Sequence, residues 1–91
     1  MKTRAMVTVN GRVQGVNFRY YTKETAERLN VTGWIKNLPD GRVQGCFEGE
    51  EKDVTKLVDW CRTGPANARV DGVTVEKGAA TGEFFAFDVR H

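Results

Sequence analysis

Residues 5–30, AMVTVNGRVQGVNFRYYTKETAERLN, change from the periodicity of a strand to that of a helix. Apolar and polar residues alternate over residues 5–10, which is the pattern of a half-buried β-strand. From Phe18 onward the apolar residues recur every three or four positions, as they do on the buried face of an amphipathic helix. Asn30 is suited to end that helix in the left-handed conformation. The segment therefore predicts a strand, a loop over residues 11–17 and a helix.

The remainder of the chain continues with a hairpin, a second helix and two more strands. The pattern predicts a hairpin, with a strand over 31–37, a turn at 38–41 and a strand over 42–48. A helix then opens at 50–53 and stops at Gly64-Pro65. Two further strands, over 70–75 and 84–89, are joined by a flexible stretch at 77–82. This β-α-β-β-α-β order, with a short final strand or extension, predicts an α+β ferredoxin-like sandwich, an antiparallel sheet with two helices on one face. The 91 residues fit a single domain, residues 1–91.

The composition is that of a folded, soluble domain, with 40% hydrophobic and 29% charged residues. No apolar run approaches the roughly 20 residues of a membrane-spanning helix, and the first residues lead into a strand pattern rather than a signal peptide. We therefore expect a cytoplasmic protein with no membrane partner. The net charge of +2 is spread evenly, without a window rich in Lys and Arg, so no nucleic-acid partner is expected.

The chain is poor in residues that bind metals or act as nucleophiles. Its two cysteines, Cys46 and Cys61, form no C-x-x-C pair and are expected to remain free thiols. Cys61 belongs to the apolar face of the second helix, whereas the strand alternation places Cys46 on the far side of the sheet. The only histidine is His91, the last residue, so neither a zinc site nor a histidine nucleophile is expected. We expect no metal and no cofactor.

The segment with functional potential is the junction of loop and helix at residues 11–19, GRVQGVNFR. A loop that leaves a strand and enters a helix has free backbone N–H groups, and the helix dipole adds partial positive charge there. Gly15 can adopt dihedral angles that let the backbone curl around an anion. The planar guanidinium of Arg19, in the first helical turn, can reach the same anion. These features favour a phosphate site, although a tight turn with a surface arginine explains them equally well.

Several common phosphate-handling motifs are absent from the sequence. No Gly-Lys-Ser/Thr follows the glycines, as a nucleotide-binding P-loop requires. Neither cysteine is followed by an arginine at the spacing of a cysteine phosphatase, and no Asp-x-Asp occurs to supply an aspartyl nucleophile. A phosphate site in this chain would therefore act by binding and positioning, without covalent catalysis.

Two segments carry a resemblance to a known family. Residues 11–19 resemble the first signature of the acylphosphatases, and residues 33–37, GWIKN, continued by residues 41–43 and Gly49, resemble the second. Both signatures lie at the family's usual spacing, and the similarity extends over essentially the whole chain. The resemblance implies one acylphosphatase-like domain and an enzyme, an acylphosphate phosphohydrolase. Such an enzyme converts a carboxyl-phosphate mixed anhydride into a carboxylate and inorganic phosphate.

The resemblance also implies roles for individual residues. It implies that backbone amides of one loop, together with the Arg19 side chain, bind the phosphoryl oxygens. That loop comprises Gln14, Gly15, Val16, Asn17, Phe18 and Arg19. It further implies that Asn37 positions the attacking water, although an asparagine before a Pro-Asp-Gly turn could by itself be a turn residue. It implies no metal and no covalent intermediate. It implies no general base from the protein either, because an oxygen of the substrate's own phosphate takes the proton of the water.

Two positions depart from the family's pattern. Asn17 stands where the family usually carries an aromatic residue, glycine or another uncharged residue, and the change is harmless if only its backbone N–H is used. If the Asn17 side chain reaches the site, affinity or substrate preference would differ. Ile35 replaces a usually smaller residue and is expected to be a packing adjustment.

Two other functions stay open on the sequence alone. The same fold could bind an anion or RNA without turnover, or it could be a regulatory domain of this family. The strands lack the aromatic pattern of an RNA-recognition motif, and both Arg19 and Asn37 are retained, which argues against these alternatives. We expect a monomer that acts on small-molecule acyl phosphates and releases inorganic phosphate. Its selectivity for the acyl group is expected to be low, because the loop would recognise the phosphate end.

Overall fold

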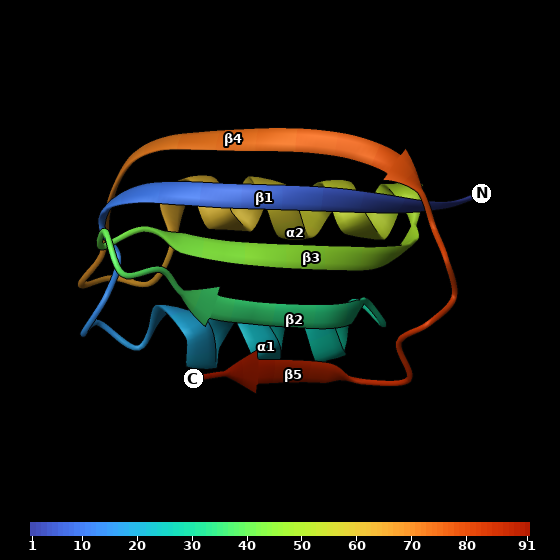
Figure 1. The fold of residues 1–91 in the computed structure, drawn as a ribbon, viewed down its shortest axis with the longest axis horizontal. Helices are drawn as coiled ribbons and strands as arrows, with labels where there is room; N and C mark the ends of the chain where they lie inside the picture. The colour runs from blue at the N-terminus through green and yellow to red at the C-terminus, as the bar shows by residue number, and fades with distance from the viewer.

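The computed structural model, which describes residues 1–91, contains the predicted strands and helices in the predicted order (Figure 1). The elements are β1 (Lys2–Arg12), α1 (Phe18–Arg28), β2 (Thr32–Asn37), β3 (Val43–Glu50), α2 (Glu51–Thr63), β4 (Arg69–Ala79) and β5 (Phe87–Arg90). The strands form one sheet in the order β4-β1-β3-β2-β5, and both helices lie against the same face of it. The predicted ferredoxin-like α+β sandwich is confirmed. Neither helix has the length and apolar character needed to cross a bilayer.

The predicted antiparallel sheet is formed by β1–β4, and the short final strand, β5, makes the sheet mixed. The pairs formed by β1, β2, β3 and β4 are antiparallel, but β5 lies parallel to β2 at the edge. The chain between β4 and β5, residues 80–86, passes the sheet at one end (Figure 1), so β5 runs opposite to β4 and in the direction of β2. As a result, the end of β5 lies beside the start of α1.

The boundaries of the elements agree with the sequence pattern at the helix ends and differ from it at β4 and β5. The sequence predicts a final strand over residues 84–89, but β5 begins only at Phe87. Asn30, just after α1, has a φ of 57°, and Gly64, at the end of α2, has a φ of 70°. Both predicted helix ends are therefore confirmed. The predicted flexible stretch at 77–82 is wrong in part, because residues 77–79 pair with β1 as the last part of β4.

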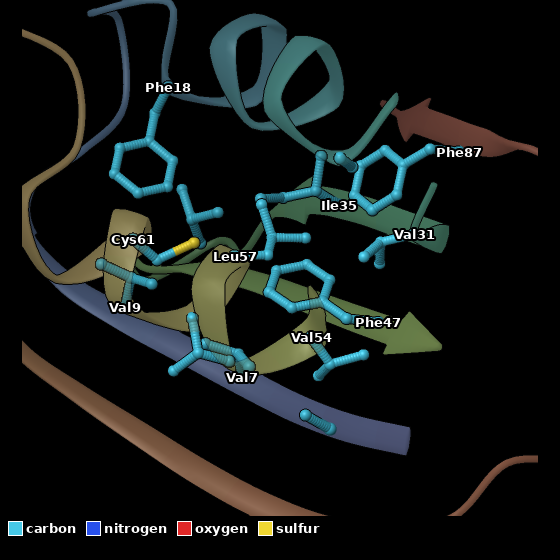
Figure 2. Close-up of a cluster of buried hydrophobic side chains, with 14 of the residues drawn as sticks. Val7, Val9, Phe18, Val31, Ile35, Phe47, Val54, Leu57, Cys61 and Phe87 are labelled. Carbon is cyan, nitrogen blue, oxygen red and sulfur yellow. The ribbon is translucent and has the colours of Figure 1, made fainter. Parts of the chain in front are cut away.

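The core lies between the sheet and the two helices, and Figure 2 shows side chains converging on it from both layers. Val7 and Phe47 enter from the sheet and Leu57 from α2, and each is at most 1% exposed. Phe18, the first residue of α1, is also 1% exposed, and its ring centroid lies 5.5 Å from that of Trp60. Burial of a phenylalanine side chain contributes up to about 3 kcal/mol. The start of α1 is thus anchored in the core.

The two cysteines lie on opposite sides of the sheet and are both free thiols, as predicted. Cys61 is buried in the core on α2, and this burial raises its pKa to about 12. Cys46 lies between Gly45 and the core residue Phe47 on β3, so its side chain is on the face away from the helices. Burial raises the pKa of Cys46 as well.

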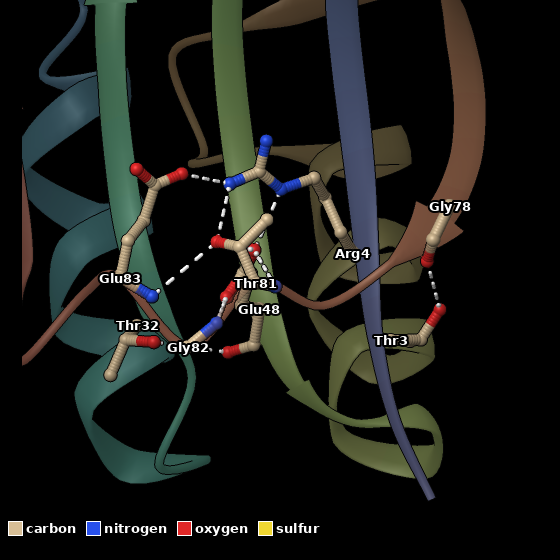
Figure 3. A network of polar contacts seen from close by, with 8 residues as sticks. All are labelled: Thr3, Arg4, Thr32, Glu48, Gly78, Thr81, Gly82 and Glu83. Atoms are coloured by element: carbon tan, nitrogen blue, oxygen red, sulfur yellow. Dashed lines mark hydrogen bonds and ion pairs between the residues drawn. The ribbon is translucent and has the colours of Figure 1, made fainter.

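A polar network on the face away from the helices holds the connection between β4 and β5 (Figure 3). At its centre the Glu48 carboxylate is 4% exposed and accepts a hydrogen bond from Arg4 Nε at 2.6 Å. It also accepts hydrogen bonds from the backbone N–H groups of Thr81 and Gly82, at 3.0 and 3.1 Å, and from the Thr81 hydroxyl at 3.1 Å. Burial opposes the ionisation of Glu48, but these hydrogen bonds outweigh it and lower its pKa. The network therefore fixes the path by which the chain reaches β5.

Glu48→Gln is expected to lower the free energy of unfolding by about 2–3 kcal/mol near neutral pH, because a neutral amide cannot accept all these hydrogen bonds. The folded-state pKa of Glu48 is lowered, so its contribution is fully present above the unfolded-state value of about 4.3 and is lost as the pH falls through the folded-state pKa. Urea unfolding at about pH 7 and about pH 3 should show a difference between variant and wild type that shrinks in acid.

The matched control for this prediction is Glu76→Gln. Glu76 is exposed on β4 and belongs to no ion pair. The control should change the free energy of unfolding by no more than about 0.5 kcal/mol at either pH. An equal loss in Glu48→Gln at both pH values would contradict the contribution assigned to the Glu48 charge.

Candidate functional site

The loop between β1 and α1 is held by buried residues that alternate with exposed ones. Val13, Val16 and Phe18 are at most 8% exposed. Gly15 and Asn17, which lie between them, are exposed and have φ angles of 75° and 61°, in the left-handed region. Left-handed residues in such a turn direct successive N–H groups toward one concave side, the geometry of an anion-binding nest. The N–H groups of residues 15–19 donate to no acceptor in the chain.

The Gln14 side chain joins this loop to the turn between β2 and β3. Its Nε2 donates to the backbone carbonyl of Leu38 at 2.8 Å and to that of Arg42 at 2.9 Å. Because Leu38 directly follows Asn37, these two bonds hold the end of β2 beside the loop. The sequence predicts only a backbone role for Gln14. No local pattern reveals this contact, since the two carbonyls lie 24 and 28 residues away along the chain.

The side chain of Arg19 extends from the first turn of α1 to the end of β5. Its Nη1 donates to the backbone carbonyl of Arg90 at 2.9 Å and lies 3.2 Å from His91 Nδ1. Arg19 belongs to none of the ion pairs, so no carboxylate neutralises its charge. The sequence, in which His91 is the last residue, predicts no site role for it. The sheet order places it here, because β5 pairs with β2 beside the start of α1.

A cavity of about 520 Å³ is lined by the loop, α1, the end of β2 and the end of β5. Five of the predicted site residues line this cavity. They are Gly15, Asn17, Phe18, Arg19 and Asn37. The other two predicted residues do not line it, because the Gln14 side chain reaches the β2–β3 turn and Val16 packs into the core.

Asn37, the last residue of β2, has a buried side-chain oxygen without a hydrogen-bond donor. Its Oδ1 is the only buried side-chain polar atom in the chain that lacks a partner. Buried acceptors in folded proteins are nearly always hydrogen-bonded, either to the protein or to water. The atom is therefore suited to accept a hydrogen bond from a molecule in the cavity, which a purely structural turn residue would not require.

The two departures from the family pattern have simple structural settings. Ile35 is 1% exposed and packs within the core, in line with a packing adjustment. The Asn17 side chain is exposed and makes no capping hydrogen bond. Asparagine is among the residues that tolerate a left-handed backbone, which accounts for its presence at this position.

The chemistry of the cavity follows from these groups. Free N–H donors at a helix start, together with an unpaired guanidinium, suit an anion that has several acceptor oxygens. No group of three or more His, Cys, Asp or Glu side chains in the chain is arranged to hold a metal ion.

The fold and this loop define a class of proteins, ferredoxin-like α+β domains in which free backbone N–H groups and an arginine lie at the start of the first helix. The sequence model of one family, Acylphosphatase, matches residues 5–89. A protein named Acylphosphatase from Geotalea uraniireducens (strain Rf4) is 66% identical over 91 residues, which cover 100% of both chains. The chain belongs to the acylphosphatase family.

Solved structures of acylphosphatases share the fold. The crystal structure of acylphosphatase from Bacillus subtilis matches with a TM-score of 0.94 at 30% identity, over 98% of this chain and 99% of that chain. The structure of an acylphosphatase from Coxiella burnetii matches with a TM-score of 0.92 at 39% identity, over 98% and 93% of the two chains. The predicted family, the enzyme class of acylphosphatases and the fold are confirmed.

Proposed function

We propose that the chain hydrolyses acyl phosphates to a carboxylate and inorganic phosphate. In this proposal Arg19 and the backbone amides of residues 14–19 hold the phosphoryl group, and Asn37 positions the attacking water. The observation that carries the proposal is the shared cavity. Its lining includes Arg19, whose guanidinium is in no ion pair, Gly15 and Asn17 of the loop with free N–H groups, and Asn37, whose Oδ1 lacks a donor.

The phosphoryl group of the substrate has several negatively charged oxygens and therefore needs several donors. The free N–H groups at the start of α1 supply donors, and the helix dipole adds partial positive charge. Arg19 adds a charge-assisted hydrogen bond, and its contacts with the Arg90 carbonyl and His91 hold the guanidinium at the cavity. Because these groups are in place before binding, they can stabilise the charge of the transition state without reorganising.

In this proposal Asn37 positions the attacking water. An O–H of the water donates to Oδ1, which satisfies that buried acceptor and orients the water oxygen toward phosphorus. The water oxygen then bonds to phosphorus while the bond from phosphorus to the bridging oxygen breaks, and the acyl group leaves as a carboxylate. The proton of the water passes to a phosphoryl oxygen of the substrate. His91 is given no role as a base, because its Nδ1 faces the Arg19 guanidinium.

The experiment that tests this proposal is the hydrolysis of benzoyl phosphate by the purified protein in excess chelator. We expect turnover that the chelator does not reduce and that inorganic phosphate inhibits competitively. A folded protein without turnover would contradict the proposal and would favour a binding module. Titration with phosphate and salt-dependent retention on a nucleic-acid column would then identify what it binds.

Asn17→Val is expected to distort the nest, because β-branched residues strain in the left-handed region. The KM for benzoyl phosphate should rise by about tenfold, and the free energy of unfolding should fall by about 1–2 kcal/mol. Asn17→Gly places a residue that adopts the left-handed backbone conformation without strain, so it should leave KM within about twofold of wild type. Steady-state kinetics and urea unfolding measure the two effects.

Asn30→Val is the matched control for this pair, because Asn30 has a φ of 57° at the far end of α1. It should cost a similar free energy of unfolding and leave KM unchanged. A rise in KM with Asn17→Gly as large as that with Asn17→Val would instead show that the Asn17 side chain touches the substrate.

A further inference from the structure

The cavity extends beyond the phosphate loop along one face of α1. Arg19, Lys23 and Glu27 all line it, as expected for residues four apart on one side of a helix. Val89 and His91, from the end of the chain, line it as well. Its volume of about 520 Å³ leaves room for an acyl group next to a phosphate held at the loop.

Besides Arg19, the cavity contains one lysine, Lys23. The Lys23 side chain is half-buried and belongs to no ion pair. Glu24 also lines the cavity but pairs with Arg28, which offsets its charge. Glu27, one turn beyond Lys23, is exposed and unpaired. The charges along the cavity therefore run from positive at Arg19 and Lys23 to negative at Glu27.

The spacing of the two positive side chains matches the length of a small diacid. Four residues of an α-helix span about 6 Å along its axis. In the acyl phosphate of an extended four-carbon dicarboxylic acid, bonds of about 1.5 Å place the second carboxylate about 6 Å from phosphorus. A phosphate beside Arg19 would thus bring that carboxylate near Lys23, whereas a longer acid would bring it toward the negative Glu27.

We propose that Lys23 binds a second carboxylate on the acyl group, so that the protein prefers acyl phosphates of short dicarboxylic acids to those of monocarboxylic acids. This inference rests on the proposed hydrolysis. It replaces the low selectivity for the acyl group, expected from the sequence, with a preference for one kind of acyl group. Lys23 contributes to binding in the ground state and the transition state alike, so the preference lies in KM rather than in kcat.

Fumaryl phosphate and crotonyl phosphate provide a matched pair of substrates for the test. Both have four carbons and a trans double bond that keeps them extended, and they differ in that only fumaryl phosphate carries the second carboxylate. For the wild type we expect kcat/KM to favour fumaryl phosphate by about two- to fivefold, the range of a partly exposed ion pair. The preference should decrease as salt is added.

Lys23→Gln should abolish the preference by raising KM for fumaryl phosphate, while kcat/KM for crotonyl phosphate stays within about twofold. Lys56→Gln is the matched control, because Lys56 is exposed on α2 and does not line the cavity. It makes the same change in net charge and should retain the preference. This comparison separates contact with Lys23 from general attraction of a more negative substrate.

The outcomes of this test are distinct. Equal hydrolysis of both substrates by the wild type, or a preference that survives in Lys23→Gln, would overturn the role of Lys23 and leave the proposed hydrolysis standing. A preference lost equally in Lys56→Gln would also overturn it, since the effect would then be one of net charge. Hydrolysis of neither substrate by a folded wild type would overturn the proposed function and, with it, this inference.

Discussion

Replacing Arg19 with alanine is expected to lower kcat/KM for benzoyl phosphate by about a thousandfold, the typical effect of removing a preorganised donor or a charged arginine from such a site. The Arg19 guanidinium is in no ion pair and is oriented by the Arg90 carbonyl and His91. Its loss leaves only the backbone N–H groups of the loop to hold the phosphoryl group. The inhibition constant for inorganic phosphate should therefore rise as well. Steady-state kinetics with phosphate as a competitive inhibitor measures both effects.

Two further variants test whether the fall in kcat/KM of Arg19→Ala comes from the loss of the contact between Arg19 and phosphate. Arg62→Ala removes an exposed arginine of α2 that does not line the cavity, and it should leave the kinetics unchanged. Arg19→Lys keeps the charge but not the planar fork, so it should recover only part of the affinity for phosphate. If a folded Arg19→Ala kept more than about a tenth of the wild-type kcat/KM, phosphate would have to be bound elsewhere.

For Asn37→Ala we expect kcat to fall by about a hundredfold or more, with the inhibition constant for inorganic phosphate within about twofold of wild type. The Oδ1 atom of Asn37 has no hydrogen-bond partner in the chain, so neither the loop nor Arg19 depends on it. The substitution therefore misplaces the water and leaves the phosphate site intact. Initial rates at saturating benzoyl phosphate, together with phosphate inhibition, measure the two quantities separately.

The stability of the Asn37 variants provides a second measure. Removing a buried acceptor that has no partner should leave the free energy of unfolding unchanged or raise it by up to about 1 kcal/mol. Asn37→Asp keeps an acceptor but adds a negative charge, so it should weaken phosphate inhibition as well as turnover. A near-normal kcat in Asn37→Ala would exclude the proposed role in positioning water.

Features that depend on neighbouring residues could be predicted from the amino-acid sequence. The change of periodicity within residues 5–30 predicts the first strand, loop and helix, because each of these is set by contacts over a few positions. The same alternation correctly separated Cys46 from Cys61. The two signature motifs indicated the family and pointed to Arg19 and Asn37, which the structure places on one cavity.

Features whose partners are distant along the chain become visible only in the folded protein. The direction of β5 depends on where residues 80–86 cross the sheet, and Glu48, which holds them, lies 33 residues before Thr81. The contact of Arg19 with His91 spans 72 residues. A local pattern shows which face of an element is buried but not which element covers it. Which element covers a buried face depends on the order of the strands, and that order is set by the packing of the whole chain. The strand order therefore also determines which groups face the cavity.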